Sequence, residues 1–376
     1  MKKKVLSALL SVAMVATLLV GCGGSNQPAP ADTAAPADTQ EAAPADTQAA
    51  APAEGSMHFE IVSKGFQHQY WQAVYKGAQN KSKELGVTMN FVGPNSESDI
   101  ADQVQMLNNA INANPSAIGL AALDTSACLD AITAAQNAGI PIVGFDSGVP
   151  GAPEGAIVAN AATDNYAAGE LAAEEAYKLI EDKLAAGTRI GVLSQDATSE
   201  SIVNRGLGFV DKMAALVADK GLTVNVEGNE KFVSDTKATK TEGADVVIEV
   251  LVPSQVTSEL SSIDCQTLLN KKDTICIYGS NQHSAEAMVT ANENIGRLGK
   301  DVVGVGFDSG AVIKAAVADG TLAGAITQAP VAMGEAVIDL LYKAANGESV
   351  SDVDTGCQWF TAENMNNEEI AQNLYD

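Results

Sequence analysis

The chain has 376 residues, and its 47 acidic and 22 basic side chains give a formal net charge of −25 at pH 7. Such an acidic chain is poorly suited to bind nucleic acid, or anionic lipid through a basic surface, and a neutral or cationic ligand is favoured. The length exceeds the roughly 250 to 300 residues that one core usually supports, which indicates two domains, and five cysteines are too few for a disulfide scaffold.

The N-terminus has the pattern of an export signal. Three lysines at 2–4 precede an apolar run over 5–20, which is too short for a typical transmembrane helix of about 20 residues. The run ends in Leu19-Val-Gly-Cys22, which resembles the lipobox of bacterial lipoproteins, whose cysteine is acylated and becomes the first mature residue. We therefore predict a lipoprotein signal peptide over 1–22 and lipidation of Cys22. An ordinary secretory signal, in which Cys22 is incidental, stays open.

Residues 23–56 repeat Pro-Ala-Asp-Thr among Ala, Gln and Glu, and they contain no basic or aromatic side chain. Such a segment buries too little apolar surface to offset its chain entropy, so we predict a disordered acidic tether stiffened by proline. A tether behind a lipidated cysteine would anchor a globular domain to the outer face of the cytoplasmic membrane. The lipid would be the only membrane contact.

From His58 the sequence alternates short apolar runs with stretches of helical periodicity. Gly86 and Pro115 end two of these stretches, as glycine and proline commonly do at helix C-termini. The alternation predicts a parallel sheet wrapped by helices. In this half we expect strands at 59–63, 87–92, 117–121 and 142–145, and helices at 70–85, 100–113 and 125–138.

The same alternation continues behind Asp164, which is a suitable N-cap for a long helix. Between Phe232 and Ser258 the pattern breaks, because a Thr-, Lys- and Glu-rich stretch precedes an apolar run over 245–252 whose placement the sequence leaves open. Elsewhere we expect strands at 189–193, 223–227, 274–278, 302–307 and 322–327 and a short strand from 358, with helices at 166–184, 202–220, 258–269, 286–292 and 331–345.

One strand motif occurs twice. Residues 140–148 and 302–310 are each an apolar run that ends in Gly-Phe-Asp-Ser-Gly. Such runs, bounded by turn formers, are typical of buried parallel strands, and open α/β sheets bind ligands at the carboxyl ends of their strands. We therefore predict that Asp146 and Asp308 come from two lobes and face one cleft. Chance recurrence of a common strand-turn pattern is the alternative.

Several short motifs of the globular part occur together in one order. They are Val62-Ser-Lys64 with Tyr70-Trp71 and Lys76-Gly-Ala-Gln79, the strand ending at Asp146, Thr163-Asp-Asn165, Asn204-Arg-Gly206, Gly279-Ser-Asn281, the strand ending at Asp308, and Ile326-Thr-Gln328. This set resembles the type I periplasmic sugar-binding proteins, the ribose and galactose group that feeds ABC importers. The resemblance implies an α/β fold of two doubly wound parallel-sheet lobes joined by a three-strand hinge. Lobe 1 would comprise 57–163 plus 329–355, and lobe 2 would comprise 164–328 plus 356–376.

The same resemblance implies a function. The chain would be an extracytoplasmic solute-binding lipoprotein that captures a monosaccharide, either a pentose or a hexose, by hinge closure. Its partners would be the sugar, an ABC permease and the ATPase of that importer, with no nucleic acid. It would act as a monomer, without a cofactor, and not as an enzyme. A sensor that presents its ligand to a membrane receptor would use the same cleft and stays open.

Carried over position by position, the resemblance implies a set of ligand-binding residues. Tyr70 and Trp71 would lie against the apolar face of a sugar ring. Asp146 and Asp308 would accept hydrogen bonds from its hydroxyls, and Arg205 would donate to them and offset the carboxylates. The full set is Lys64, His68, Tyr70, Trp71, Asp146, Arg205, Phe232, Asn281, Asp308 and Gln328.

Three positions depart from the ribose-type pattern. Ser147 stands where an Arg is expected, His68 stands for an Asn, and Gln282 stands for an Asp. Lys64, together with Gly93-Pro94 and Ser147, is similar instead to the autoinducer-2-binding branch of the fold. Autoinducer-2 or another small polyol therefore stays open as the ligand.

A glycoside hydrolase is a further alternative, because two facing carboxylates also describe that class of enzyme. Hydrolysis needs one carboxyl kept protonated. Arg205 nearby would favour ionisation of both carboxylates, which suits binding better than hydrolysis.

Metal sites and disulfides are not indicated. The three histidines show no metal-ligand spacing, and no Asp-rich loop has the spacing of an EF-hand. Cys276 lies in a predicted buried strand and reads as a small hydrophobic residue. The four cysteines behind the tether allow three pairings, and we expect no essential disulfide among Cys128, Cys265, Cys276 and Cys357.

Overall fold

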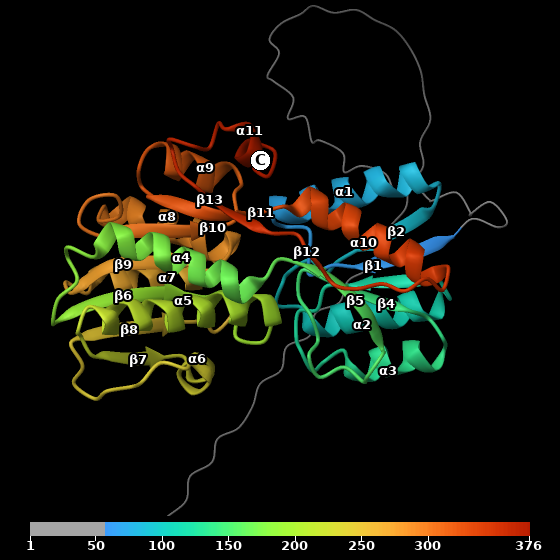
Figure 1. Ribbon diagram of the computed structural model, residues 1–376, viewed down its shortest axis with the longest axis horizontal. Coiled ribbons are helices and arrows are strands. Elements are labelled where there is room, and N and C mark those ends of the chain that lie inside the picture. Colours follow the sequence, from blue (N-terminus) through green and yellow to red (C-terminus); the bar gives the residue numbers. More distant parts are fainter. Residues whose placement is uncertain (1–56) are drawn as a thin grey trace, which may run out of the picture. The chain divides into compact units, whose positions relative to one another are not determined.

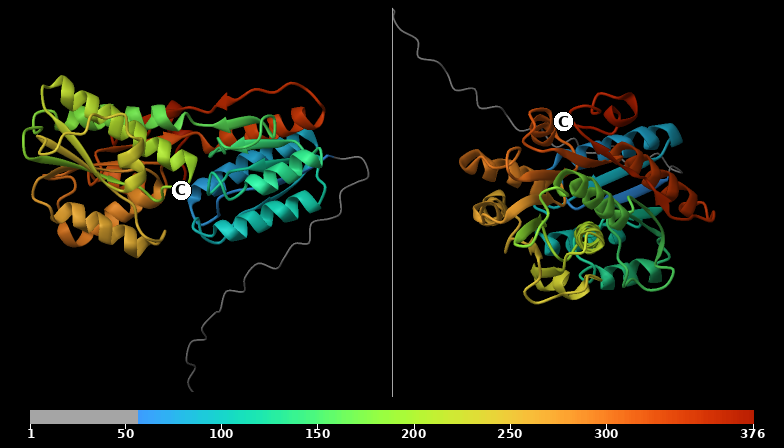
Figure 2. Two further views of the ribbon diagram at one scale, coloured as in Figure 1. Left: turned by 90° about the horizontal axis from the view of Figure 1, so that it is seen from below. Right: turned by 60° about the vertical axis from the view of Figure 1, so that its left-hand side comes forward.

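The computed structural model describes residues 57–376. The predicted signal peptide over 1–22, with Cys22, and the tether over 23–56 lie outside the described residues. Within 57–376 the strands form two sheets, each with helices packed on it (Figures 1 and 2). In this part of the chain no helix combines the length and the hydrophobicity that crossing a bilayer requires.

The first sheet has six strands, all parallel, in the order β12-β5-β4-β3-β1-β2. Helix α10 (Pro330–Ala345) packs on α1 (Gln69–Leu85) and on β3, β4 and β5, while α2 (Ile100–Asn112) and α3 (Leu129–Asn137) pack together (Figure 1). We call this sheet with its four helices the first lobe. Its strands are β1 (His58–Val62), β2 (Thr88–Val92), β3 (Ala117–Leu120), β4 (Ile142–Phe145), β5 (Ile157–Ala162) and β12 (Val353–Asp354).

The second sheet has seven strands in the order β13-β11-β10-β9-β6-β8-β7, of which only the edge strand β13 is antiparallel to its neighbour. We call it, with its helices, the second lobe. Its strands are β6 (Thr188–Leu193), β7 (Val224–Gly228), β8 (Val246–Leu251), β9 (Thr274–Gly279), β10 (Val303–Phe307), β11 (Gly324–Gln328) and β13 (Cys357–Phe360). The helices are α4 (Asn165–Ile180), α5 (Glu200–Asp219), α6 (Glu230–Asp235), α7 (Ser258–Asn270), α8 (Gln282–Ile295), α9 (Ala311–Ala318) and α11 (Glu368–Ala371).

The chain passes between the two sheets three times: after β5, after β11, and between β12 and β13. At the first passage Asp164 caps α4, because its carboxylate accepts a hydrogen bond from the N–H of Ala167. The predicted fold class, two doubly wound lobes with a three-strand hinge, is confirmed. The lobe boundaries at 163, 329 and 355 stay a prediction.

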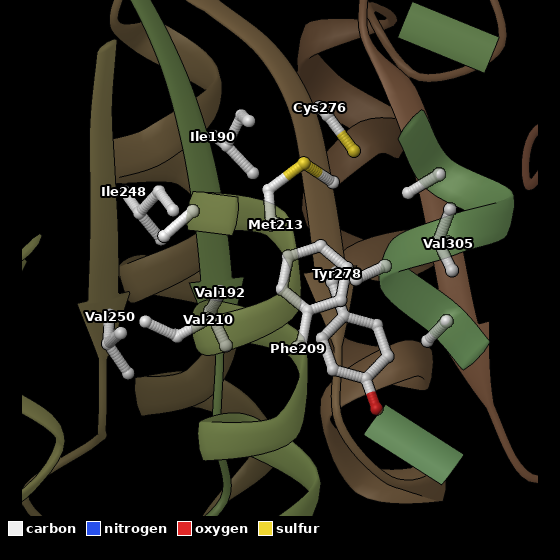
Figure 3. Packing of buried hydrophobic residues seen from close by; sticks show 14 of the residues in the cluster. Ile190, Val192, Phe209, Val210, Met213, Ile248, Val250, Cys276, Tyr278 and Val305 are labelled. Carbon is white, nitrogen blue, oxygen red and sulfur yellow. The ribbon is translucent and has the colours of Figure 1, made fainter. Parts of the chain in front are cut away.

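Aromatic and β-branched side chains build the core of the second lobe. Phe209 of α5 stacks on Tyr278 of β9, with ring centroids 4.4 Å apart and planes at 12°. Figure 3 shows Met213 of the same helix between these rings and the strand residues Ile190 and Cys276. Full burial of each such side chain stabilises the fold by about 1.5 to 3 kcal/mol. The core therefore fixes α5, which carries two of the residues that line the site described below.

Three segments show where the sequence prediction fell short. The apolar run left open became β8, which lies inside the second sheet between β6 and β7, as expected of a strand buried on both faces. Strand β5 was missed because its sequence is rich in alanine, and helix α9 was missed because it is short and almost wholly apolar. All four cysteines of 57–376 are free, and Cys276 is buried in β9.

Candidate functional site

Asp146 and Asp308 occupy equivalent positions at the carboxyl ends of β4 and β10. Both have a positive φ, 57° and 71°, a conformation that Asp tolerates better than most residues. Each backbone N–H still bonds to the next strand, from Asp146 to Ala161 O at 3.0 Å and from Asp308 to Ile326 O at 2.6 Å. The repeated motif thus ends each strand with a carboxylate at the sheet edge.

Both carboxylates line one small cavity between the lobes. Its volume is about 20 Å³, because side chains of both lobes fill the cleft. That is room for roughly one water molecule. The structure thus brings the two aspartates together, and it brings all the sequence-predicted site residues except Phe232 to the same place. The lining residues are Lys64, His68, Tyr70, Trp71, Glu97, Asp146, Ile202, Arg205, Asn281, Gln282, Asp308 and Gln328.

Phe232 lies elsewhere, and its expected role as a ligand contact is corrected. It is fully buried in the core of the second lobe, on α6. A Cβ added to Gly206 would lie 2.4 Å from Phe232 Cε1, so the ring packs directly on that glycine of α5. Ile202 is the apolar side chain that the second lobe contributes to the cavity.

Arg205 connects the cavity to the hinge. Its Nε donates to Asn165 Oδ1 at 2.8 Å and its Nη2 donates to Gln328 Oε1 at 3.0 Å, next to two of the three passages between the lobes. Its guanidinium lies 4.2 Å above the ring of Phe307. These contacts fix the orientation of a buried cation at the base of the cleft.

The guanidinium of Arg205 also lies between the two aspartates, 3.9 Å from a carboxylate oxygen of each. Burial lowers the pKa of Arg205, but Asp308 and Asp146 outweigh burial and raise it. Burial raises the pKa of Asp308, against the opposing effects of Arg205 and of two hydrogen-bonding amides. Arg205 therefore favours the ionised form of Asp308, but burial outweighs this effect and leaves the pKa of Asp308 raised.

Asp146 is held by two groups of its own lobe. Lys64 Nζ lies 3.1 Å from Asp146 Oδ2, and the hydroxyl of Tyr70 donates to Oδ1 at 2.9 Å. Burial lowers the pKa of Lys64, but neighbouring carboxylates, led by Asp146, outweigh it and raise the pKa. Burial and Asp146 together raise the pKa of Tyr70 well above its ordinary value. Lys64 is therefore a charged donor beside Asp146, and Tyr70 is a neutral one.

Asp308 is held instead by amide groups of the second lobe. The backbone N–H of Gln282 donates to Asp308 Oδ2 at 3.0 Å, and Gln328 Nε2 donates to Oδ1 at 2.6 Å. Asn281 caps the start of α8, and Gln282, the first residue of that helix, lines the cavity. Gln282, noted in the sequence only as a departure from the ribose-type pattern, is thus part of the site.

Glu97, in the loop after β2, is a lining residue that the sequence analysis missed. Its Oε1 accepts from Trp71 Nε1 at 2.7 Å, and its Oε2 accepts from Gln195 Nε2 of the other lobe at 3.0 Å. Burial raises the pKa of Glu97, but His68 and Lys64, together with these two hydrogen bonds, outweigh burial and lower it. Its position behind a parallel strand, at the edge where Asp146 also lies, was a signal that could have found it.

The two predicted aromatic residues belong both to the core and to the cavity. Trp71 is 1% exposed and contacts Tyr70 and Phe145 edge-on, with centroids 5.0 and 6.2 Å away. His68 is next to them, and its Nε2 is buried with no hydrogen-bond partner within 57–376. The site thus combines an aromatic wall, carboxylate acceptors and fixed cations, which suits a small ligand with several hydroxyl groups.

Comparisons with known proteins agree with this geometry. A family described as periplasmic binding protein domain matches residues 59–349. The ribose import binding protein RbsB of Bacillus subtilis (strain 168) is 25% identical over 282 residues, which are 73% of this chain and 78% of that protein. A solved structure of an ABC transporter solute binding protein from Agrobacterium vitis, with bound D-fucose, is 31% identical, with a TM-score of 0.71 over 85% of this chain and 100% of that one. A protein of Brachyspira murdochii, described as an ABC transporter and LacI family transcriptional regulator, is also 31% identical, with a TM-score of 0.72 over 86% of this chain and 100% of that one.

Proposed function

Because this chain belongs to the family of periplasmic binding proteins, we propose that it captures a monosaccharide between its two lobes and delivers it to an ABC importer. Like the solute-binding proteins to which it is similar, it is a binding protein and not an enzyme. The observation that carries the proposal is the single cavity into which two strand-end aspartates project, with Arg205 between them. Carboxylates accept from the adjacent hydroxyls of a sugar, and a guanidinium donates to its oxygens.

Capture would proceed by hinge motion. A cavity of about 20 Å³ is too small for a sugar ring, so the lobes part before a ligand enters. Closure over the ligand then excludes water, and each buried hydrogen bond to a hydroxyl gains strength in the drier surroundings. A permease and its ATPase would recognise the closed form.

The ligand would be a pentose or a hexose, since ribose and D-fucose are named for two of the similar proteins. Autoinducer-2 is the second candidate, because Lys64, Gly93-Pro94 and Ser147 are similar to the branch of the fold that binds it. The lipidated Cys22 would anchor the protein to the outer face of the cytoplasmic membrane. Replacement of Cys22 by Ser should then release the protein from the membrane fraction.

A thermal-shift screen of the full chain against pentoses, hexoses and autoinducer-2 tests the proposal. A ligand at 100 times its dissociation constant should add about 2.7 kcal/mol of stability. Asp146→Ala and Arg205→Ala should each abolish the shift. Lys271→Met is the matched control, because it removes a partly buried ion pair with Glu249 in the second lobe and leaves the cavity lining unchanged. A shift retained in both cavity variants, or no shift with any of the sugars, would contradict monosaccharide binding at this site.

A further inference from the structure

Lys64 lies in the cavity wall, but its hydrogen-bond donors are already occupied. Its Nζ lies 3.1 Å from Asp146 Oδ2, 3.1 Å from Ser199 Oγ and 3.1 Å from Ser201 Oγ. An ammonium group has three N–H donors, and three acceptors surround this one. The residue is 3% exposed. In the closed arrangement Lys64 therefore has no donor left for a ligand.

The two serines that take those donors belong to the other lobe. Ser199 and Ser201 lie at the start of α5, whereas Lys64 follows β1 of the first lobe. Ser147, from the repeated strand motif of the first lobe, joins the same group: its Oγ lies 3.2 Å from Ser199 Oγ and accepts from the N–H of Ser201 at 3.2 Å. All three serines are buried. The four residues thus bond one lobe directly to the other.

Further bonds between the lobes flank this group. The N–H of Thr125 donates to Thr198 O at 3.2 Å, and the hydroxyl of Thr198 donates to Leu123 O at 3.2 Å. On the other side the N–H of Gly148 donates to Glu200 Oε2 at 3.3 Å. The five residues that make these bonds, Leu123, Thr125, Gly148, Thr198 and Glu200, are not part of the cavity lining. These bonds form a seam that joins the lobes through protein groups alone.

We propose that four residues, Lys64, Ser147, Ser199 and Ser201, form a latch that holds the two lobes together through direct hydrogen bonds. Lys64 then positions one lobe against the other and does not contact the ligand. The latch stabilises the closed form by itself, so the chain populates that form without ligand. The proposal rests on the hinge closure of the proposed function but not on the identity of the ligand.

Hydrogen–deuterium exchange of the full chain without ligand tests the latch. The amides of Thr125 and Gly148 donate across the seam, so they exchange only when the lobes part. Lys64→Met should speed their exchange at least about tenfold, because hydrogen bonds to a charged group are lost. The double variant Ser199→Ala with Ser201→Ala should do the same, and it leaves the ion pair of Lys64 and the cavity lining in place.

Two controls separate the latch from a general loss of stability. Exchange in the core strand β6 should stay unchanged in the serine double variant, and Lys271→Met should leave the seam unchanged. Unaltered exchange at Thr125 and Gly148 in the serine double variant would overturn the proposal, even if Lys64→Met failed to fold. Exchange of these two amides in the parent chain at the rate of exposed loop amides would overturn it as well. Failure of the sugar screen would instead remove the proposed ligand and leave this result intact.

Discussion

The two Gly-Phe-Asp-Ser-Gly strand ends share a backbone but differ in what surrounds their carboxylates. Asp146 and Asp308 both have a positive φ, and both bond through their N–H to the next strand. Asp146 is paired with the ammonium of Lys64, whereas Asp308 accepts from neutral amides. The strand end therefore delivers a carboxylate to the cavity, while side chains from distant parts of the chain determine the charges around it.

Replacing the two carboxylates one at a time should change the free energy of unfolding most. Asp146→Asn would leave the buried ammonium of Lys64 without its nearest counter-ion, and breaking such a pair costs about 3 to 5 kcal/mol. Asp308→Asn keeps an acceptor for one amide and removes a carboxylate that burial disfavours, so it should cost about 1 kcal/mol or less. Urea unfolding of the ligand-free variants at pH 7 measures the difference. Equal losses would show that the two surroundings are energetically alike.

The pH dependence should sharpen the same contrast. Burial raises the pKa of Asp308 above its unfolded value, so the folded chain holds this proton more tightly than the unfolded chain. The stability that this tighter proton binding contributes is fully present below the unfolded pKa of about 4, and it is lost as the pH rises through the folded pKa. Asp308→Asn lacks this loss. The free energy of unfolding of this variant, minus that of the parent chain, should therefore rise between pH 4 and pH 7. Urea titrations at both pH values measure this difference. A difference that stays constant would contradict the raised pKa.

The same comparison shows which features a sequence can predict. The strand ends were predictable because an apolar run followed by Gly-Phe-Asp-Ser-Gly is a local signal, and both copies carry it. Phe232 was misplaced because only the packing of α6 on Gly206 decides that its ring enters the core. Glu97 looked like one loop acid among serines, and its burial depends on Gln195 from the other lobe. Local sequence patterns could not predict contacts between residues that lie far apart in the sequence.

Replacing the first glycine of each Gly-Phe-Asp-Ser-Gly motif by alanine tests how tightly the two strand ends are packed. A Cβ on Gly144 would lie 2.0 Å from Asn160 Oδ1, whereas the nearest atom to a Cβ on Gly306 is Ala325 Cβ at 3.1 Å. Gly144→Ala should therefore cost about 1 to 3 kcal/mol through overpacking, and Gly306→Ala should cost less. Thermal unfolding of the two variants compares them directly. A larger loss for Gly306→Ala would mean that the second copy is the more tightly packed.

The serines that follow the two aspartates should differ least in their effect on stability. Ser147 Oγ reaches across to Ser199 of the other lobe, whereas Ser309 Oγ accepts from the N–H of Tyr375 at 3.0 Å within the second lobe. Ser309→Ala should lose about 1 kcal/mol, confined to the C-terminal residues, because one hydrogen bond is removed there. Exchange should then quicken at the amide of Tyr375 and not at the seam. Ser147→Ala should give the reverse pattern, since its hydroxyl contributes to joining the lobes. If Ser309→Ala also loosened the seam, the two copies would be coupled through the hinge, and their surroundings could no longer be treated as independent.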